Sequence, residues 1–500
     1  MHTHHRLWLA TALCLGLSCT RDTGQIQPPA DRSVNVQAGL RAGWQVADRP
    51  VVIWSLAGRM AHYKIPGVSI AVVDSGRIVW ARGFGLKQTG TADSVTATTL
   101  FQAASISKPV TATATLHLVD QGKLALDENV NTYLTSWKVP DNQFTAREKV
   151  TLRRILSHSA GLSVHGFPGY AVTDALPTVV EVLNGAKPRA NTDPVRVVAV
   201  PGTAWSYSGG GTTIMQLILA DVTGKTFPAL MREIVLGPAG MTASTYEQPL
   251  PTARAAEAAS GHLADGSMLP GHWHVYPEMA PAGLWTTPTD LLKWAIEIAA
   301  TRAGRSTRFF SQDMARQMLT VVKAPTGLGP FLAGEGRSFQ FGHGGDNVGF
   351  HADVVYFPET GQGAAIMTNG DNGQDLITEI KTAIGTEYAW PDAGPKTITA
   401  VAIDSARLAL AVGEYVIELG GQAIPATVAW FGGKLLVSSA FQPAQEELVP
   451  QSATTFIGID HGYRYEFAGP AGRKAGTVRI DLMDGMVLTG RRKPPVGTKH

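Results

Sequence analysis

Hydrophobic and polar positions follow two periods along the central part of the chain. The run 68–73, Val-Ser-Ile-Ala-Val-Val, is followed by Asp-Ser-Gly-Arg and a second apolar run at 78–80, which predicts a β-hairpin with a glycine-containing turn. Between Val51 and Trp390, strand-like runs of this kind are mixed with longer runs that have helical length and spacing. The other strand-like runs are 349–356 and 363–367, and the helix-like runs are 109–124 and 211–223.

The pattern changes after the segment Pro391-Asp-Ala-Gly-Pro395. Short apolar runs follow at even intervals with turn residues between them, which predicts a small β-sandwich or β-barrel. We therefore place a domain boundary near residue 395, with a mixed domain at 45–390 and a C-terminal β domain at 396–492. The expected strands are 414–419, 426–430, 434–438, 446–450, 454–459, 463–467, 477–482 and 486–489.

The beginning of the chain has the pattern of a targeting segment. A polar, weakly basic start is followed by the apolar run Leu7–Leu17, which is too short to cross a bilayer, so residues 1–19 are predicted to be a signal peptide. We expect an exported protein, periplasmic or secreted. Cys19 follows Ser18 and is a candidate for lipidation, the one membrane attachment that the sequence offers, although Gly16 replaces the leucine usual in such signals. Residues 20–44 are predicted to be a linker.

Composition narrows the class of protein. The 500 residues have a formal net charge of +2 and only 16% charged residues, against about 25% in an average soluble domain. No basic stripe is present, which argues against nucleic acid as a partner. Apolar residues run through the whole length, which excludes a disordered chain. The two cysteines, Cys14 and Cys19, lie within the predicted signal peptide, so the mature domains carry no disulfide.

The first chemical motif is Phe101-Gln-Ala-Ala-Ser105-Ile-Ser-Lys108-Pro109. A helix that begins at Ser105 would place Ser105 and Lys108 on one face, one turn apart. The amine can then accept the hydroxyl proton, and free helix N–H groups lie beside the reacting atom. Pro109 disfavours helical geometry at Lys108, with the least effect in a first turn. Taken alone, the motif also fits an ordinary surface helix start.

The second motif, Pro201-Gly-Thr-Ala-Trp-Ser-Tyr207-Ser-Gly209-Gly-Gly211, precedes a helix-like run. Its glycines form a tight turn that can present Tyr207 to a cleft. A phenol, with a pKa of about 10, becomes a general acid or base only where a cation such as Lys108 stabilises the phenolate. The alternative is a core tyrosine above a glycine-rich turn.

The third motif is Gln340-Phe-Gly-His343-Gly344-Gly345-Asp346, just before a strand-like run. Glycines allow the backbone to approach a ligand and leave N–H groups free to bind an oxyanion. His343 adds a donor whose charge depends on its surroundings. The alternative is a turn with a buried, hydrogen-bonded histidine.

Other histidines and aromatic residues favour structural roles. His158, in Leu-Ser-His-Ser, is expected to fix a loop by hydrogen bonds. No acidic pair near the remaining candidates completes a ligand set, so we predict no metal site. Trp273, Tyr276 and Trp285 are expected to pack in the core or to form a pocket wall. The histidines weighed as metal ligands are His262, His272 and His274.

In this order and spacing, the three motifs resemble those of the serine β-lactamase and penicillin-binding superfamily, in particular its class C-like branch of β-lactamases, D,D-peptidases, D-aminopeptidases and esterases. The resemblance covers about residues 45–388 and includes the scaffold-like segments 156–162 and 281–285. The family's Ser-x-x-Lys, Tyr-x-Asn and Lys-Thr-Gly elements map onto Ser105/Lys108, 207–209 and 343–345. The resemblance implies an α+β fold, in which helices flank an antiparallel sheet beside a helical lobe. It also implies a lipocalin-like C-terminal domain.

The resemblance also implies acyl transfer without a cofactor. Ser105 would attack a carbonyl group of a small-molecule or peptide substrate, and Lys108 and Tyr207 would move protons. The oxyanion would bind the backbone N–H groups of Ser105 and Asp346, beside Gly344 and Gly345. The oligomeric state is open, and we expect the C-terminal domain to cap the cleft or to mediate assembly.

Two departures from the family pattern affect the expected substrate. Gly209 stands where the family's asparagine binds an acyl amide, and His343 stands where a lysine faces a carboxylate. A charge-assisted hydrogen bond is about twice as strong as a neutral one, so both changes weaken recognition of β-lactams. The sequence favours an ester or amide hydrolase, D-amino-acid peptidases included. The alternatives are a β-lactamase or D,D-peptidase, and a non-catalytic penicillin-binding sensor or binding module.

Overall fold

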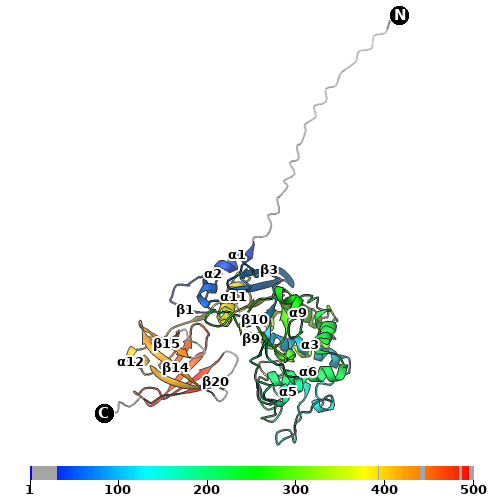
Figure 1. Ribbon diagram of the computed structural model, residues 1–500. Coiled ribbons are helices and arrows are strands. Elements are labelled where there is room, and N and C mark those ends of the chain that lie inside the picture. The colour runs from blue at the N-terminus through cyan, green and yellow to red at the C-terminus, as the bar shows by residue number, and fades with distance from the viewer. Residues whose placement is uncertain (3–30, 392–393, 420–421, 440–444, 483–486, 495–500) are drawn as a thin grey trace.

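An antiparallel sheet of six strands forms the centre of the N-terminal domain in the computed structural model, which describes residues 1–2, 31–391, 394–419, 422–439, 445–482 and 487–494. The strands are β2 (Gly67–Asp74), β3 (Arg77–Gly85), β8 (Phe331–Ala333), β9 (Gln340–Asn347), β10 (Phe350–Phe357) and β11 (Gln362–Thr368). Their order is β3-β2-β11-β10-β9-β8, and the two predicted strand pairs are β2–β3 and β10–β11 (Figure 1).

The sheet separates two hydrophobic cores, because successive residues of a strand point to opposite faces. Phe341 and Val354 pack in the core that also contains Trp294 of α9 (Pro288–Arg302). Val355 and Ile366 pack in the second core. That core is covered by α11 (Gly373–Glu387) and α2 (Leu56–Tyr63). Helices on both faces of an antiparallel sheet confirm the predicted α+β class.

The helical lobe surrounds two buried helices, α3 (Ser107–Asp120) and α6 (Gly209–Thr223), which correspond to the two predicted helices. The interior of α3 holds threonines whose hydroxyl groups donate to the backbone; Thr113 donates to the carbonyl oxygen of Pro109 at 3.1 Å. The shorter elements are α4 (Leu152–Leu156), α5 (Val179–Asn184), α7 (Phe227–Met231), α8 (Met279–Ala282), α10 (Gln312–Met318), β4 (Phe101–Gln102), β5 (Tyr170–Ala171), β6 (His274–Val275) and β7 (Trp285–Thr286). Among the residues described, no helix combines the length and hydropathy of a bilayer span.

The C-terminal domain is a closed antiparallel barrel of eight strands, as one of the two predicted β architectures requires. β20 pairs with β13, so the sheet has no free edge. All eight expected runs contribute a strand. They are β13 (Gly413–Leu419), β14 (Gln422–Phe431), β15 (Lys434–Ser439), β16 (Glu446–Pro450), β17 (Thr455–Gly458), β18 (Arg464–Ala468), β19 (Thr477–Asp481) and β20 (Val487–Arg492), and α12 (Ser405–Leu408) precedes them.

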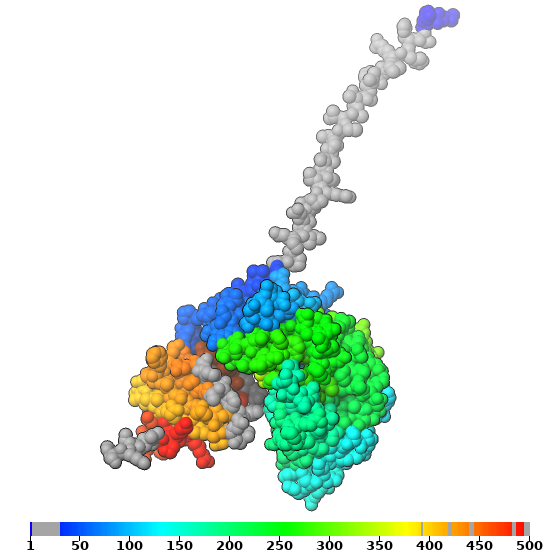
Figure 2. Space-filling model, in the orientation of Figure 1, coloured from blue at the N-terminus to red at the C-terminus, as the bar shows by residue number. Residues whose placement is uncertain are grey.

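The two domains meet at a short parallel strand pair. β1 (Trp44–Val46) pairs with β12 (Lys396–Ile398), and Val46 and Ile398 form a small core with Val449 of the barrel. Figure 2 shows the barrel, in orange and red, beside the blue N-terminal segment. Arg49 adds a two-pronged ion pair to Glu447, with both nitrogen–oxygen distances at 2.7 Å.

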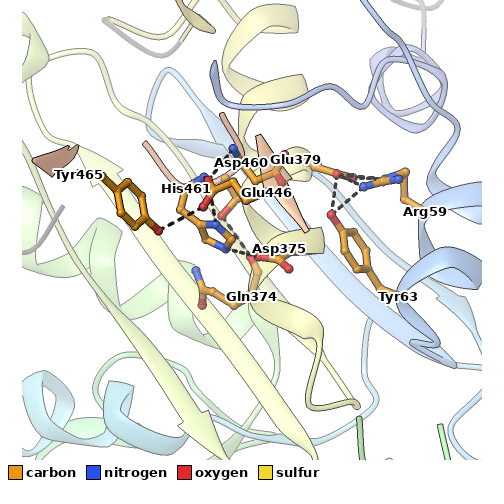
Figure 3. A network of polar contacts seen from close by, with 10 residues as sticks. Arg59, Tyr63, Gln374, Asp375, Glu379, Glu446, Asp460, His461 and Tyr465 are labelled. Carbon is orange, nitrogen blue, oxygen red and sulfur yellow. Dashed lines mark hydrogen bonds and ion pairs between the residues drawn. The ribbon is translucent and has the colours of Figure 1, made fainter. Parts of the chain in front are cut away.

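A polar cluster joins the barrel to the first turn of α11 (Figure 3). The His461 imidazole lies between two carboxylates, with Nε2 3.0 Å from Asp375 Oδ1 and Nδ1 3.3 Å from Glu446 Oε1. Glu446 is fully buried and also accepts the backbone N–H groups of Asp460 and His461, each at 2.9 Å. Burial acts to lower the pKa of His461, but the two carboxylates outweigh it and raise the pKa to about 10. The imidazole is therefore charged.

The start of the described chain differs from the expected linker, which was predicted to extend to residue 44. Residues Arg32–Ala38 form helix α1, capped by the Asp31 side chain, which accepts the Ser33 N–H at 3.2 Å. Val36 of α1 and Leu40, two residues after the helix ends, are buried in the second core and hold this segment against it. The predicted signal peptide, with Cys14 and Cys19, falls on residues 3–30, which lie outside the described residues.

Candidate active site

Ser105 lies in a strained turn at the entrance to α3. The turn Ala104–Ile106 is a short 3-10 helix, and α3 begins at Ser107, two residues later than expected. Ala104 has a φ of 47°, in the left-handed region that non-glycine residues seldom adopt. This backbone bend separates the turn from the strand β4, and Ser105 is left half-buried. Pro109 falls in the first turn of α3, where backbone N–H groups have no partner in the helix.

Lys108 contacts the Ser105 hydroxyl directly. Its Nζ lies 2.9 Å from Ser105 Oγ and 3.1 Å from the carbonyl oxygen of Pro281, and the side chain is almost wholly buried. Burial lowers the pKa of Lys108 to about 7, although the carboxylate of Asp346 acts in the opposite direction. A substantial share of the amine is therefore neutral near pH 7. In that form it can donate to Pro281 and accept the Ser105 proton.

Tyr207 is brought to the same centre by the turn before α6. Lys108 Nζ lies over the Tyr207 ring, 4.8 Å from its centroid. Burial raises the pKa of the Tyr207 phenol, and a hydrogen bond with Ser105 only partly opposes this. The condition we set for a phenolate base, a cation that stabilises the phenolate, is therefore not met. Tyr207 is a neutral phenol that can donate and relay a proton.

His343 is neutral and has a defined tautomer. Its Nδ1 lies 2.5 Å from the carbonyl oxygen of Gly344, which can only accept, so Nδ1 carries the proton. The lone pair of Nε2 then faces the Tyr207 hydroxyl, which donates to it at 3.5 Å. Burial, assisted by the nearby charge of Lys108, lowers the pKa of His343 to about 3. The residue at the position of the family's lysine is thus an acceptor for Tyr207.

The two glycines after His343 have different roles. A Cβ at Gly345 would collide with the carbonyl oxygen of Ala103 and lie 3.2 Å from the Ser105 nitrogen, whereas a Cβ at Gly344 would meet its nearest atom at 3.9 Å. Gly345 therefore lets β9 pack directly on the backbone of the Ser105 turn.

Asp346 and His351 form an ion pair across the β9–β10 hairpin, with Oδ1 and Nδ1 2.5 Å apart. Neighbouring atoms partly desolvate the Asp346 carboxylate, which acts to raise its pKa, but the contact with His351 and the surrounding positive charges lower the pKa below the ordinary value. Asp346 is therefore a carboxylate, and its side chain is 70% exposed. Sequence reasoning assigned a role to its backbone and missed this pair, for which the spacing of five residues offers no motif.

Aromatic rings surround Tyr207. His158 stacks on it with centroids 4.3 Å apart, and its Nδ1 accepts the Ser208 N–H at 3.2 Å, so His158 fixes the Tyr207 turn. Burial lowers the pKa of His158 well below its usual value, which keeps the ring neutral. Phe331 stacks parallel to Tyr207 on another side, with centroids 6.3 Å apart. His158 fits the expected structural role, while Phe331 was missed because a lone phenylalanine before a turn carries no signal.

A second missed element anchors the end of β9. Asn347 Nδ2 donates to Gln102 Oε1 at 2.8 Å and to the carbonyl oxygen of Ala282 at 3.2 Å. This buried link ties β9 to the turn before Ser105 and to α8, which carries the Pro281 acceptor of Lys108. The signal in the sequence is only that Gln102 interrupts an otherwise apolar run.

The three histidines weighed as metal ligands have separate partners. Nδ1 of His262 lies 2.9 Å from the carbonyl oxygen of Asn369, His272 lies 3.0 Å from Ser260 Oγ, and His274 lies 2.9 Å from the carbonyl oxygen of Pro168. Trp285 is fully buried against Trp273, with ring centroids 5.2 Å apart, in agreement with a core position. Across the described part of the chain, no three metal-ligating side chains form a group that could hold an ion.

Comparison with known proteins relates this geometry to a family. The profile of the Beta-lactamase family matches residues 54–384. Penicillin-binding protein 4 of Amycolatopsis lactamdurans is 27% identical over 64% of this chain and 85% of its own length. A D-aminopeptidase of Brucella anthropi is 25% identical over 62% of this chain and 58% of its own length. An unguisins hydrolase of Aspergillus campestris is 32% identical over 47% of this chain and 44% of its own. The chain thus spans less than two thirds of the last two relatives.

Solved structures show the same fold. The octameric penicillin-binding protein homologue from Pyrococcus abyssi aligns with a TM-score of 0.60 at 21% identity, covering 87% of this chain and 98% of that one. The D-amino acid amidase from Ochrobactrum anthropi aligns with a TM-score of 0.54 at 21% identity, covering 71% and 99%. With a family profile matched over most of the chain and a serine, lysine and tyrosine gathered at one centre, the chain belongs to the beta-lactamase family of serine hydrolases.

Proposed function

We propose that this protein hydrolyses an ester or amide bond through an acyl-enzyme on Ser105, with D-amino-acid peptides among the amide substrates. The observation that carries the proposal is the 2.9 Å contact between Lys108 Nζ and Ser105 Oγ. Because the pKa of Lys108 is about 7, the amine can take the hydroxyl proton at neutral pH. The proposal assigns Ser105 as nucleophile and Lys108 as base.

Acylation forms a bond between Ser105 Oγ and the substrate carbonyl carbon and breaks the bond to the leaving group. Lys108 receives the serine proton, and the neutral phenol of Tyr207 gives its proton to the leaving group and recovers one from Lys108. The developing oxyanion binds the backbone N–H groups of Ser105 and Asp346. Water then attacks the acyl carbon and gives a proton to Lys108. Lys108 passes this proton to Ser105 Oγ as the bond between Oγ and the acyl carbon breaks, and the acid product leaves.

The substrate class follows from two positions. Gly209 offers no side-chain amide, and neutral His343 offers no fixed positive charge for a carboxylate. Both features disfavour β-lactams relative to simple esters and amides. The relative named as a D-aminopeptidase supports a peptide or amide substrate, and the relative named as an unguisins hydrolase supports hydrolysis as the reaction.

We further propose that the protein is exported, as the apolar run Leu7–Leu17 supports. The mass of the mature protein from the producing cell tests this. Loss of residues 1–19 is expected, and a full-length mature chain would contradict it. A mass increase from lipid on Cys19, abolished by globomycin, would identify a lipoprotein.

A fluorophosphonate label tests the nucleophile. We expect one covalent adduct, on the peptide that contains Ser105, and no adduct in Ser105→Ala. Ser206→Ala is the matched control, because Ser206 is exposed and directly precedes Tyr207 without belonging to the proposed machinery. Labelling of this control should be unchanged. An adduct elsewhere, or none, would overturn the assignment of Ser105.

A substrate screen then separates the alternatives. We expect clear turnover of short 4-nitrophenyl esters, turnover of some D-amino-acid amides, and weak or no turnover of a chromogenic cephalosporin. Faster turnover of the cephalosporin than of the esters would contradict the substrate argument. A burst of product without turnover would identify a covalent sensor instead of a hydrolase.

A further inference from the structure

We propose that the wall beside Tyr207 binds an uncharged, apolar acyl side chain, aromatic or branched, and that Phe167 determines this preference. The inference rests on the proposed function and extends it to the chemistry of the acyl group. Phe167 occupies the space into which a side chain at position 209 would project, so the amide-binding group expected there is replaced by an aromatic ring.

The backbone places Phe167 firmly against the start of α6. The N–H of Gly209 donates to the carbonyl oxygen of His165 at 2.9 Å, and the N–H of Gly210 donates to that of Val164 at 3.0 Å. A Cβ on Gly209 would lie 2.9 Å from Phe167 Cε2 and 3.0 Å from the His165 oxygen. Because that space is filled, Gly209 is required by the ring beside it, and any side chain at 209 would displace Phe167.

Phe167 packs beside Gly209, two residues after Tyr207, and other rings lie around Tyr207. His165 lies 4.8 Å from Tyr207 between ring centroids, and Phe331 lies 4.7 Å from His343. These rings come from four separate segments: the loop between α4 and β5, the turn before α6, β8 and β9. Phe167 and Phe331 are half-buried, so each keeps part of its surface available to a ligand. An apolar group bound there would remove aromatic surface from water on both partners.

The charges around Ser105 exclude an anionic acyl group. His343 is buried and neutral, and Lys108 must lose its proton to act as a base. The charged group on this side is the exposed carboxylate of Asp346, which acts on the pKa of Lys108 and is paired with His351. A carboxylate on the acyl group would meet a like charge at Asp346 and no fixed cation at position 343, which disfavours it relative to an uncharged group of the same size.

The test compares the 4-nitrophenyl esters of phenylacetate, acetate and succinate, which share one leaving group. For the unchanged protein we expect kcat/KM to be highest for phenylacetate and lowest for the anionic succinate. Phe167→Ala is expected to lower the phenylacetate-to-acetate ratio of kcat/KM about tenfold, in the range that a changed contact in an apolar pocket produces. Phe167→Leu should keep most of the ratio.

Phe339→Ala is the matched control, because Phe339 is also half-buried but packs against Arg302, with the guanidinium 5.3 Å from its ring centroid. The phenylacetate-to-acetate ratio of kcat/KM should not change in Phe339→Ala. A double variant, Gly209→Asn with Phe167→Ala, should gain on the ester of N-acetylglycine, whose acyl group carries an amide.

The outcomes separate the two proposals. If no ester acylates Ser105, the proposed function fails. If esters are hydrolysed but Phe167→Ala leaves the ratio unchanged, this inference fails and the proposed function stands. Fluorophosphonate labelling of every variant shows whether its centre is folded. Should Phe167→Ala not label, Phe167→Val decides, and a phenylacetate-to-acetate ratio equal to that of the unchanged protein overturns the inference.

Discussion

His343 and His461 are both largely shielded from water, yet His343 is neutral and His461 is charged. Their neighbours explain the difference. His343, beside Tyr207, has its pKa lowered to about 3 because burial dominates and the nearby charge of Lys108 is positive. His461, between the barrel and α11, has its pKa raised to about 10 because two carboxylates face its ring nitrogens. Burial alone would have made both neutral.

The difference separates a reactive centre from a docking contact. At the reactive centre burial lowers the pKa of Lys108 to about 7 and keeps His343 and Tyr207 neutral, so that under the proposed function a proton can pass between Ser105, Lys108 and Tyr207 at little cost. At the docking contact the charges are retained and paired, so the contact holds two surfaces together without exchanging protons near pH 7. Changes at the two places should therefore produce different kinds of loss.

The largest effect is expected from removing the amine at the reactive centre. Lys108→Met keeps the length of the side chain but has no proton acceptor, so kcat/KM for an ester should fall on the order of 10³-fold. The pKa of His343, followed by NMR, should rise only in part, because burial is the main cause of its shift and Lys108 the second. A variant with ordinary activity would show that Lys108 is not the base.

A smaller loss is expected from disturbing the geometry of that centre while keeping its charges. Gly345→Ala places a methyl group against Ala103 and Ser105, so it should lower kcat/KM about 100-fold, the loss typical of one misplaced oxyanion donor. Gly344→Ala is the matched control, because a Cβ at Gly344 would meet its nearest atom at 3.9 Å. Equal activities of the two variants would contradict the role of the close approach at Gly345.

Removing the charged histidine should weaken docking and leave the chemistry alone. His461→Ala leaves the buried Glu446 without one partner, so the interface should lose about 1–3 kcal/mol. Limited proteolysis between the domains should become faster, while kcat/KM for an ester stays unchanged. His62→Ala, at an exposed histidine of α2, is the control. A loss of activity in His461→Ala without faster proteolysis between the domains would contradict the separation of the two regions.

The pH dependences should separate the same two regions. Because Lys108 has a pKa of about 7 and is proposed as the base, kcat/KM should fall about tenfold per pH unit below that value. His461 has a raised pKa, so its contribution to docking is complete below pH 6.5, its ordinary value, and is lost as pH rises through about 10. Measuring kcat/KM and the rate of limited proteolysis as functions of pH checks both dependences. Docking that weakens together with the rate near pH 7 would contradict this assignment.

Much of the architecture could be predicted because each region has a regular local pattern. Period-two apolar runs and turn residues identified the β2–β3 and β10–β11 pairs and all eight barrel strands. Helix α1 was not predicted, because Val36 is its one residue in the hydrophobic core and the next core residue, Leu40, lies beyond the end of the helix. Closure of the barrel, as opposed to a sandwich, depends on the pairing of β20 with β13, which no local pattern encodes.

The sequence predicted that Ser105, Lys108 and Tyr207 come together, but it did not predict the protonation state of each group. Fixed spacing selects Ser105 and Lys108, but the charges follow from burial by residues distant in sequence. The neutral phenol of Tyr207 and the acceptor role of His343 depend on such packing. Phe167 was missed for the same reason, since only the folded chain places it against Gly209.

The parallel pairing of β1 with β12 also bears on how the chain is made. Residues 44–46 leave the ribosome before the strands of the central sheet, whereas their partners at 396–398 emerge only after that sheet is complete. During synthesis β1 therefore waits without a partner while the N-terminal domain folds, since domains generally fold as units from the N-terminus. The barrel is the last part to arrive, and it joins a catalytic scaffold that has already been assembled.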